Sequence, residues 1–506
     1  MDKKRKAARI FGFGVISQTV TLILGIVIPK LLIVNYGSEI NGLLSSVRQI
    51  FVYVALLEAG IGTASLQALY APIAADDKDK TSAIMAATDH YYRRTGILYG
   101  VAVVLLAICY PIIVRSEIEA PIVIAVIFFQ GASGVINYFF QGKFAILLRV
   151  DGKSYITTNA ATIVSVVTKF VQIGLMLAGC NVIAVQFAHF AINFLQMVFI
   201  SYYVRKHYPW LDLKVTPDYA ALKQSKNVII HQISGLIFNN TDVLVLTFYC
   251  GLTTVSIYSL YSLIITCVSN IIDTICSSVE FALGQAFNSD RKYFLKLQEV
   301  YETYYLAVSF ALFTVTLIMF PSFIRIYSKG ITDANYADPY LPGLFVALNI
   351  LMYSRRTSSQ IINFAGHFQQ TQWRSVLESA INLGISLLLV SRIGIYGVLI
   401  GTIAALLYRT NDIIIYANKT ILGRSPLKTY RRWGTNILIA VICCMGWNYL
   451  LPNIDSYFHW FGIAIAVSIT CCGLFFSVDS FADIEAFRYV KSLILDRLKV
   501  RNANSQ

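Results

Sequence analysis

The chain has 506 residues, of which 57% are hydrophobic and only 13% are charged. Soluble chains usually carry about a quarter charged residues, so this composition excludes an ordinary soluble domain and indicates a polytopic membrane protein. The formal net charge of +14 does not indicate nucleic acid binding, because the basic residues lie in short connections between apolar segments.

Apolar segments of about 20 residues or more are long enough to cross a bilayer, and we expect fourteen of them. The first follows a basic N-terminus and continues to about Val34 without a convincing cleavage site, so we expect a retained helix rather than a signal peptide. The expected spans are about 10–34, 40–70, 94–114, 120–148, 154–178, 182–204, 227–250, 254–284, 301–326, 340–364, 374–391, 394–418, 433–451 and 457–478.

The distribution of basic residues predicts the orientation of these spans. With the N-terminus in the cytoplasm, 31 of the 41 Lys and Arg fall in cytoplasmic segments, five fall outside or at outer helix ends, and five fall inside spans. Cytoplasmic connections are normally enriched in Lys and Arg. We therefore expect a multi-pass protein of a bacterial inner (plasma) membrane with both termini in the cytoplasm.

The longest basic connection divides the first twelve spans into two groups of six. Both groups begin with a span, a short outer loop containing Gly (Gly37 or Gly251) and a long second span, which suggests the parallel repeat common in transporters. The expected organisation is an N-lobe at 1–204, a cytoplasmic linker at 205–226, a C-lobe at 227–420, two further spans at 421–480 and a cytoplasmic amphipathic tail at 481–506.

The seventh span carries ionisable groups within the membrane. His231 and Asp242 lie on one helical stripe of this span. Ionisable groups at this depth are costly in hydrocarbon and usually face a water-filled path or a partner, so both are candidates for coupling transport to an ion or a proton. The alternative is a polar contact that holds helices together.

Further polar side chains follow helical stripes in at least seven spans, which favours a shared aqueous cavity. Its cations are Arg48, about 12 Å below the outer surface at 1.5 Å per residue, and Lys169, Arg355 and Arg356. Arginine binds phosphate and carboxylate oxygens with two parallel hydrogen bonds, so an anionic cargo is indicated. The alternative for each Arg is a structural ion pair, which we prefer for Arg409 because Asp412 lies three residues away.

The polar candidates for cargo binding are Asn137, Gln141, Asn193, Asn240, Asn270 and Gln360.

Motifs for hydrolytic, nucleotide or metal chemistry do not occur in the sequence. It contains no Gly-rich phosphate loop, no His-Glu-x-x-His motif and no Cys-x-x-Cys pair among its nine cysteines. We therefore expect a protein that is not an enzyme, with no metal site and no cofactor, and leave open its coupling to a proton or sodium gradient.

The order of several short motifs resembles the multidrug/oligosaccharidyl-lipid/polysaccharide exporter superfamily, and within it the polysaccharide flippases of the O-antigen and capsule type. The motifs are Ile28-Pro29-Lys30, the segment Asn35 to Gly42, Asn240-Thr241-Asp242, Gly251 and Ser256 to Ser259. The resemblance implies an all-α fold of two six-helix lobes forming a V, with two additional C-terminal helices.

The resemblance also implies a cargo and partners. The cargo would be an oligosaccharide repeat unit on undecaprenyl pyrophosphate, moved from the inner to the outer leaflet. The partners would be this lipid-linked oligosaccharide, membrane lipids and polysaccharide polymerase or assembly proteins. A lipid II flippase and a cation-coupled small-molecule exporter of the same superfamily remain the alternatives.

Overall fold

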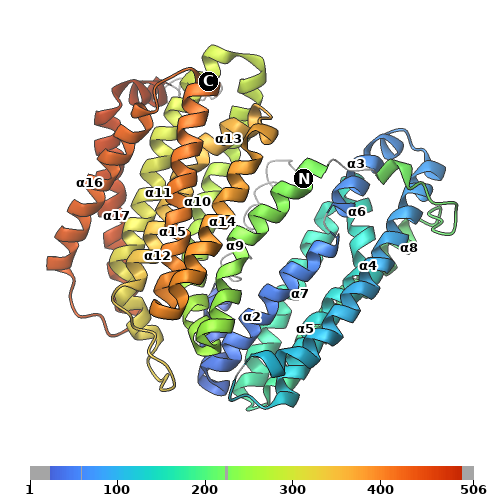
Figure 1. Cartoon of the computed structure of the whole chain (residues 1–506). Coiled ribbons are helices and arrows are strands. Elements are labelled where there is room, and N and C mark those ends of the chain that lie inside the picture. The colour runs from blue at the N-terminus through green and yellow to red at the C-terminus, as the bar shows by residue number, and fades with distance from the viewer. Residues whose placement is uncertain (1–22, 59, 115, 223–225, 493–506) are drawn as a thin grey trace, which may run out of the picture. The chain divides into compact units, whose positions relative to one another are not determined.

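The structure is a computed structural model that describes residues 23–58, 60–114, 116–222 and 226–492, and every regular element in these ranges is a helix (Figure 1). The prediction of an all-α polytopic membrane protein is confirmed. After the helix Ile23–Tyr36, the elements are α2 (Ser38–Val54), η1 (Ala55–Glu58), α3 (Ile61–Ala74), α4 (Lys78–Ile113), α5 (Ala120–Ile136), η2 (Asn137–Gln141), α6 (Gly142–Val150), α7 (Ser154–Leu177), α8 (Val182–His207), η3 (Ala220–Leu222), α9 (Lys226–Cys250), α10 (Leu252–Ser289), α11 (Arg291–Tyr327), α12 (Leu341–Ser354), α13 (Arg356–Phe364), α14 (Phe368–Ile393), α15 (Ile395–Tyr416), η4 (Ala417–Leu422), α16 (Leu427–Leu450) and α17 (Tyr457–Ala482).

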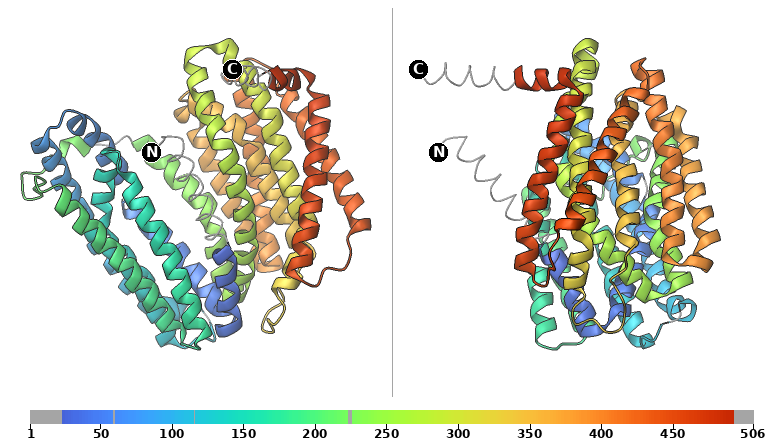
Figure 2. Two further views of the ribbon diagram at one scale, coloured as in Figure 1. Left: turned by 180° about the vertical axis from the view of Figure 1, so that it is seen from behind. Right: turned by 90° about the vertical axis from the view of Figure 1, so that its left-hand side faces the viewer.

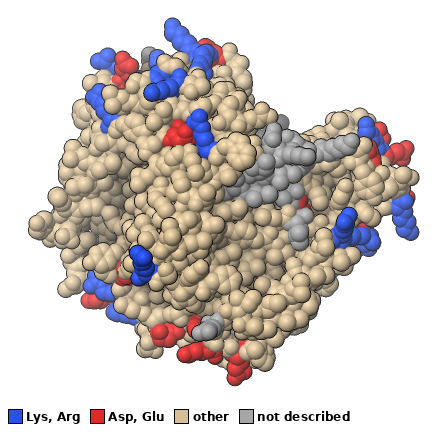
Figure 3. Space-filling model, viewed as in Figure 1, with Lys and Arg blue, Asp and Glu red and all other residues tan. Residues whose placement is uncertain are grey.

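Ten helices among the described residues are long and apolar enough to cross a membrane. On the face shown in Figure 3, most Lys, Arg, Asp and Glu gather toward the ends of the helices, and the surface between them is mainly uncharged. Two expected spans are divided into shorter helices. The span expected at 40–70 is interrupted near Gly60, which precedes α3 and has a φ of 95°. The span expected at 340–364 is interrupted at Arg355.

The chain forms two compact units, Met1–Leu260 and Tyr261–Gln506, which we call unit 1 and unit 2. By their internal contacts, α9 and the first turns of α10 group with unit 1. The lobes expected at 1–204 and 227–420 rest on the order of the spans and on the sequence repeat, and they stay a prediction.

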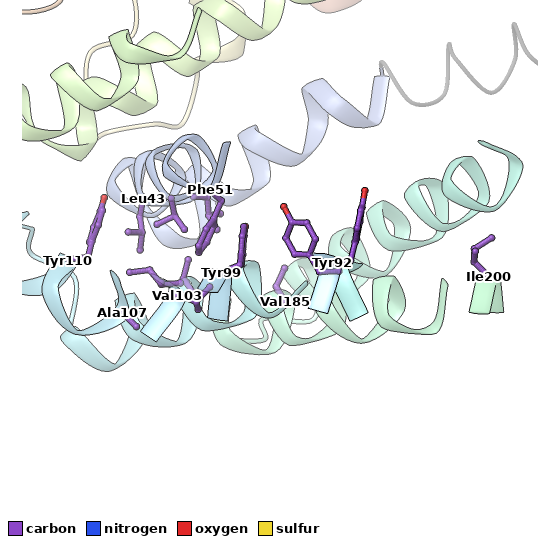
Figure 4. Packing of buried hydrophobic residues seen from close by; sticks show 14 of the residues in the cluster. Leu43, Phe51, Tyr92, Tyr99, Val103, Ala107, Tyr110, Val185 and Ile200 are labelled. Atoms are coloured by element: carbon purple, nitrogen blue, oxygen red, sulfur yellow. The ribbon is translucent and has the colours of Figure 1, made fainter. Parts of the chain in front are cut away.

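Unit 1 packs α4 against α5, and α5 and α7 against α8. Figure 4 shows part of its core, in which the rings of Phe51 and Tyr99 stack with centroids 5.7 Å apart and Val103 lies beside them. Helices in lipid approach closely where small residues face a neighbour. Gly131 and Gly134 of α5 provide this contact, since a Cβ atom at either position would overlap Val103 or Tyr99.

Two glycines have similar positive φ angles at short connections between helices of unit 1. Gly37 joins the first described helix to α2 with φ of 87°, and Gly251 joins α9 to α10 with φ of 83°. Residues with a Cβ atom rarely adopt these angles, so glycine permits both tight turns. The repeat that the sequence suggests stays a prediction.

Unit 2 is built around α11, which packs against α12, α16 and α17, while α14 and α15 form a hairpin. In this hairpin, a Cβ atom at Gly397 would overlap the backbone of Leu389, and one at Gly401 would overlap Ser386. Small residues thus bring these two helices into close contact.

The chain turns at Asp483, after α17, and residues 484–492 form a short helix directed away from the axis of α17 (Figure 2, right). Ile484 and Phe487 are exposed on it, beside Arg488 and Lys491. The cytoplasmic amphipathic tail predicted at 481–506 stays a prediction, and its residues 493–506 lie outside the described residues.

Candidate functional site

A row of hydrogen bonds joins α2 to α9 and α10, and we call it the polar seam. Asn41 donates to Oγ of Ser256 at 2.7 Å. Thr247 donates to Oγ of Ser46 at 2.9 Å, and Tyr110 of α4 donates to the same oxygen. Each of these polar groups finds a partner on another helix, as buried hydroxyl and amide groups require in lipid.

The seam continues past the middle of α2. Gln49 donates to the side-chain oxygen of Asn240, whose own amide donates to the carbonyl of Leu236 at 2.8 Å. The hydroxyls of Tyr53 and Thr241 lie 2.7 Å apart. Asn240, a predicted cargo ligand, is thus placed in a contact between helices, which leaves its role in binding a prediction.

Arg48 lies on α2 between these seam residues, and its side chain is exposed. It forms no ion pair with any residue that the structure describes. Its positive charge interacts electrostatically with the ring of His189 on α8. Asn193, one turn further along α8, donates to the backbone carbonyl of His189 at 2.7 Å. An arginine within a membrane span normally has an anionic partner or faces water, so Arg48 is suited to receive an anion.

Lys169 is placed on α7, with its side chain partly exposed. Its Nζ lies 4.0 Å from the position that a Cβ atom of Gly25 would occupy. Lys169 therefore faces the helix Ile23–Tyr36, within unit 1.

Asp242 is 7% exposed and is held in unit 1 by an aromatic hydroxyl. Tyr258 of α10 donates to Oδ2 of Asp242 at 3.0 Å. The negative charge of Asp242 also interacts electrostatically with Tyr53. The role of Asp242 in coupling stays a prediction. The side chain of His231, the other predicted coupling residue, lies outside the described residues.

The π-helix η2 begins at Asn137 and ends at Gln141, and neither of these two side chains is fully buried. A π-turn inserts an additional residue into the helix and often occurs at functional sites. It interrupts the regular stripe that the sequence suggested, because residues on either side of the insertion no longer keep α-helical spacing.

In unit 2, Arg356 is engaged by two acids of α10. It pairs with Asp273 and with Glu280, the latter at 2.9 Å. Tyr353 donates to Asp273 at 3.5 Å, and Tyr301 donates to Glu280 at 3.4 Å. The charge of Arg356 is therefore balanced within the protein.

Arg355 points to a different helix and pairs with Glu378 of α14. Glu378 also lies 3.6 Å from Arg409, which in turn pairs with Asp412 at 2.6 Å, and Arg374 pairs with Asp412 as well. The predicted pairing of Arg409 with Asp412 is confirmed. The break between α12 and α13 falls at Arg355, whose partner lies on a different helix from the partners of Arg356.

The remaining predicted ligands of unit 2 are Asn270 and Gln360. Asn270 is partly exposed on α10, and its backbone carbonyl accepts a hydrogen bond of 2.7 Å from Thr274. Gln360 is buried on α13, and its Oε1 has no hydrogen-bond partner among the described residues.

Several residues that define these surroundings are not apparent from the sequence. Gln49, Tyr53 and Tyr258 face the predicted ligands on other helices, and Glu280 and Glu378 neutralise two predicted cations. The seven-residue spacing of Asp273 and Glu280 places both on one face of α10 and is the signal that could have indicated a shared partner.

Comparisons with solved structures identify the class of fold. A multidrug resistance MATE family transporter of the MOP superfamily in an inward-facing conformation matches with a TM-score of 0.60 at 15% identity, covering 79% of this chain and 94% of that one. The lipid II flippase MurJ in an inward closed conformation matches with a TM-score of 0.66 at 15% identity, covering 93% of this chain and 99% of that one.

This chain therefore has the fold of MOP superfamily transporters. No protein-family model matches the sequence, and a comparison with curated proteins gives no match. At this identity the likeness concerns the fold alone, and the two solved structures are described as a multidrug resistance transporter and a lipid II flippase.

Proposed function

We propose that this chain is a flippase that moves undecaprenyl-pyrophosphate-linked oligosaccharide repeat units from the inner to the outer leaflet of a bacterial plasma membrane by alternating access, for surface polysaccharide synthesis. The fold of MOP superfamily transporters supports transport as the activity. The observation that carries the choice of cargo is the exposed Arg48 of α2, in the span expected at 40–70, without an ion pair among the described residues.

The diphosphate of the cargo binds Arg48 in this proposal. The guanidinium group offers a planar pair of donors that fits phosphate oxygens, and Lys169 adds a second cation within unit 1. Arg355 and Arg356 contribute less, because Glu378 and the acids of α10 already balance their charge.

The glycan contacts the amide side chains of unit 1. Asn193 of α8 and Asn137 and Gln141 of η2 belong to this unit, and none of the three is fully buried. Amides can both donate to and accept from sugar hydroxyls, so they suit a neutral polar cargo. The lipid chain stays in the bilayer throughout transport.

A lipid II flippase is the second candidate. The MurJ structure covers 93% of this chain, whereas the MATE structure covers 79%. Lipid II shares the lipid diphosphate chemistry with the first candidate and differs in its sugar and peptide portion. A cation-coupled exporter of small molecules ranks lower, because an arginine without a paired acid repels cationic drugs.

Reconstitution of the purified chain into proteoliposomes distinguishes these candidates. Labelled undecaprenyl-pyrophosphate oligosaccharide, lipid II and a cationic dye are supplied separately, and their appearance on the opposite side is measured. The proposal expects flipping of the lipid-linked oligosaccharide in preference to the other two. Preference for lipid II selects the second candidate, and movement of the dye alone contradicts both.

A further inference from the structure

A cavity of about 310 Å³ lies in unit 2 where α16 begins and α17 ends. This volume is at the lower end of the range for small-molecule sites, about 300–1,000 Å³. Its walls combine cationic, acidic and hydroxyl side chains with two apolar ones, and they consist of Thr303, Lys428, Arg431, Arg432, Thr435, Asp479, Ala482, Asp483, Ile484 and Glu485.

Internal ion pairs fix part of this wall. Arg432 pairs with Glu302 at 2.8 Å and with Asp483 at 2.6 Å, and Lys428 pairs with Glu299 at 2.8 Å. The charges of these groups are balanced by ion pairs within the protein, which gives the cavity a defined shape.

Two lining groups differ from the rest. Arg431 is exposed and has no ion pair among the described residues. Asp479 is 2% exposed, and its Oδ1 accepts a hydrogen bond of 3.4 Å from Asn436, while no described group donates to its Oδ2. A buried carboxylate oxygen without a donor is costly, so Asp479 favours a ligand with N–H or O–H groups.

The position of the cavity indicates a ligand from the bilayer. Its rim includes Ile484, the first residue of the short helix that turns away from α17 (Figure 2), and Phe487 on that helix is exposed. Amphipathic helices of this kind lie at the level of the lipid head groups. Near the cavity, Leu438 of α16 and Phe481 of α17 expose apolar surface on which acyl chains can pack.

We propose that this cavity binds the head group of a phospholipid with a primary ammonium group, of the ethanolamine type. The phosphate binds Arg431, and the ammonium donates to Oδ2 of Asp479. Basic pockets between membrane helices at this level are typical of lipid head-group sites, and the buried acid adds selectivity for the ammonium. A choline head group has no N–H donor, and a glycerol head group carries no cation.

The test measures lipid binding to the full chain in detergent, by native mass spectrometry with phosphatidylethanolamine, phosphatidylglycerol or phosphatidylcholine of matched acyl chains. We expect phosphatidylethanolamine to bind about tenfold more tightly than phosphatidylcholine, the effect of one charge-assisted hydrogen bond. Equal binding of the three lipids contradicts the proposal.

Variants separate the two contacts. Asp479→Asn is expected to remove the preference for phosphatidylethanolamine over phosphatidylglycerol. Arg431→Ala, an exposed position that does not threaten folding, weakens binding of both. Arg488→Ala is the matched control, because Arg488 is exposed outside the cavity, and it leaves binding unchanged. A preference for phosphatidylethanolamine that survives Asp479→Asn, or lipid binding that is unchanged in Arg431→Ala, overturns the site. The readout involves no transport and is therefore independent of the proposed cargo.

Discussion

Asn41 and Ser256, 215 positions apart in the chain, are joined by a hydrogen bond of 2.7 Å between α2 and α10. The neighbouring Gly42 makes this contact feasible, because a Cβ atom there would overlap the backbone carbonyl of Leu252. The start of α2 and the start of α10 therefore meet directly, at Asn41 with Ser256 and at Gly42 with Leu252. This contact depends on the absence of a side chain at one position.

Substitution Gly42→Ala should therefore separate α2 from the start of α10. Overpacking of this kind costs about 1–3 kcal/mol, and we expect a lower unfolding temperature in detergent together with reduced flipping. Gly174→Ala on α7 is the matched control, because a Cβ atom there meets no neighbour. A Gly42→Ala protein as stable and active as the parent would show that the close approach is unimportant.

The ion pair of Arg355 with Glu378 should contribute to stability. Both side chains are largely buried, so Glu378→Gln leaves a cation without its partner in a region of low dielectric constant. Breaking a buried pair costs about 3–5 kcal/mol, and thermal unfolding measures the loss. An unchanged unfolding temperature would indicate that Arg355 finds another anion.

Asp242 provides a test of coupling. Asp242→Asn keeps the shape of the side chain and its hydrogen bond with Tyr258 but removes its negative charge. If Asp242 couples transport, the variant loses its response to an imposed pH or sodium gradient in proteoliposomes, whereas the parent keeps it. Transport of a dianion outward is already favoured by about 2.3 kcal/mol per charge per 100 mV, so the assay is performed without a membrane potential. Equal responses of variant and parent would assign Asp242 a structural role.

The orientation in the membrane is tested by reporter fusions. The split of 31 basic residues against five predicts that both termini and the connection at 205–226 are cytoplasmic. Fusions at Gln506 and within 210–220 should be active only with reporters that function in the cytoplasm. Activity of an externally active reporter at either site would contradict the span count.

The sequence predicts the local features of this fold well. Hydropathy indicates helices such as α7 and α8, and the three-residue spacing of Arg409 and Asp412 indicates their ion pair, because both signals depend only on neighbours along the chain. Glycine at positions 37 and 251 likewise marks turns that require positive φ.

Contacts between distant helices could not be predicted. The acids that balance Arg356 are 76 and 83 residues away, and the partner of Arg355 lies beyond the break between α12 and α13. Helical periodicity places a side chain on a face but does not say which helix covers that face. For this reason, the sequence could not show that Arg355 and Arg356 are paired with acids of other helices, while Arg48 has no ion pair among the described residues.

The most direct test of the proposed function is the flipping rate of undecaprenyl-pyrophosphate oligosaccharide in proteoliposomes containing the parent, Arg48→Ala or Arg48→Lys. We expect Arg48→Ala to abolish flipping with an unchanged unfolding temperature, since Arg48 has no ion pair to lose among the described residues. Arg48→Lys should recover only part of the rate, because a lysine lacks the paired donors of the guanidinium group. Full flipping by Arg48→Ala would contradict the assignment of Arg48 as the site of the diphosphate.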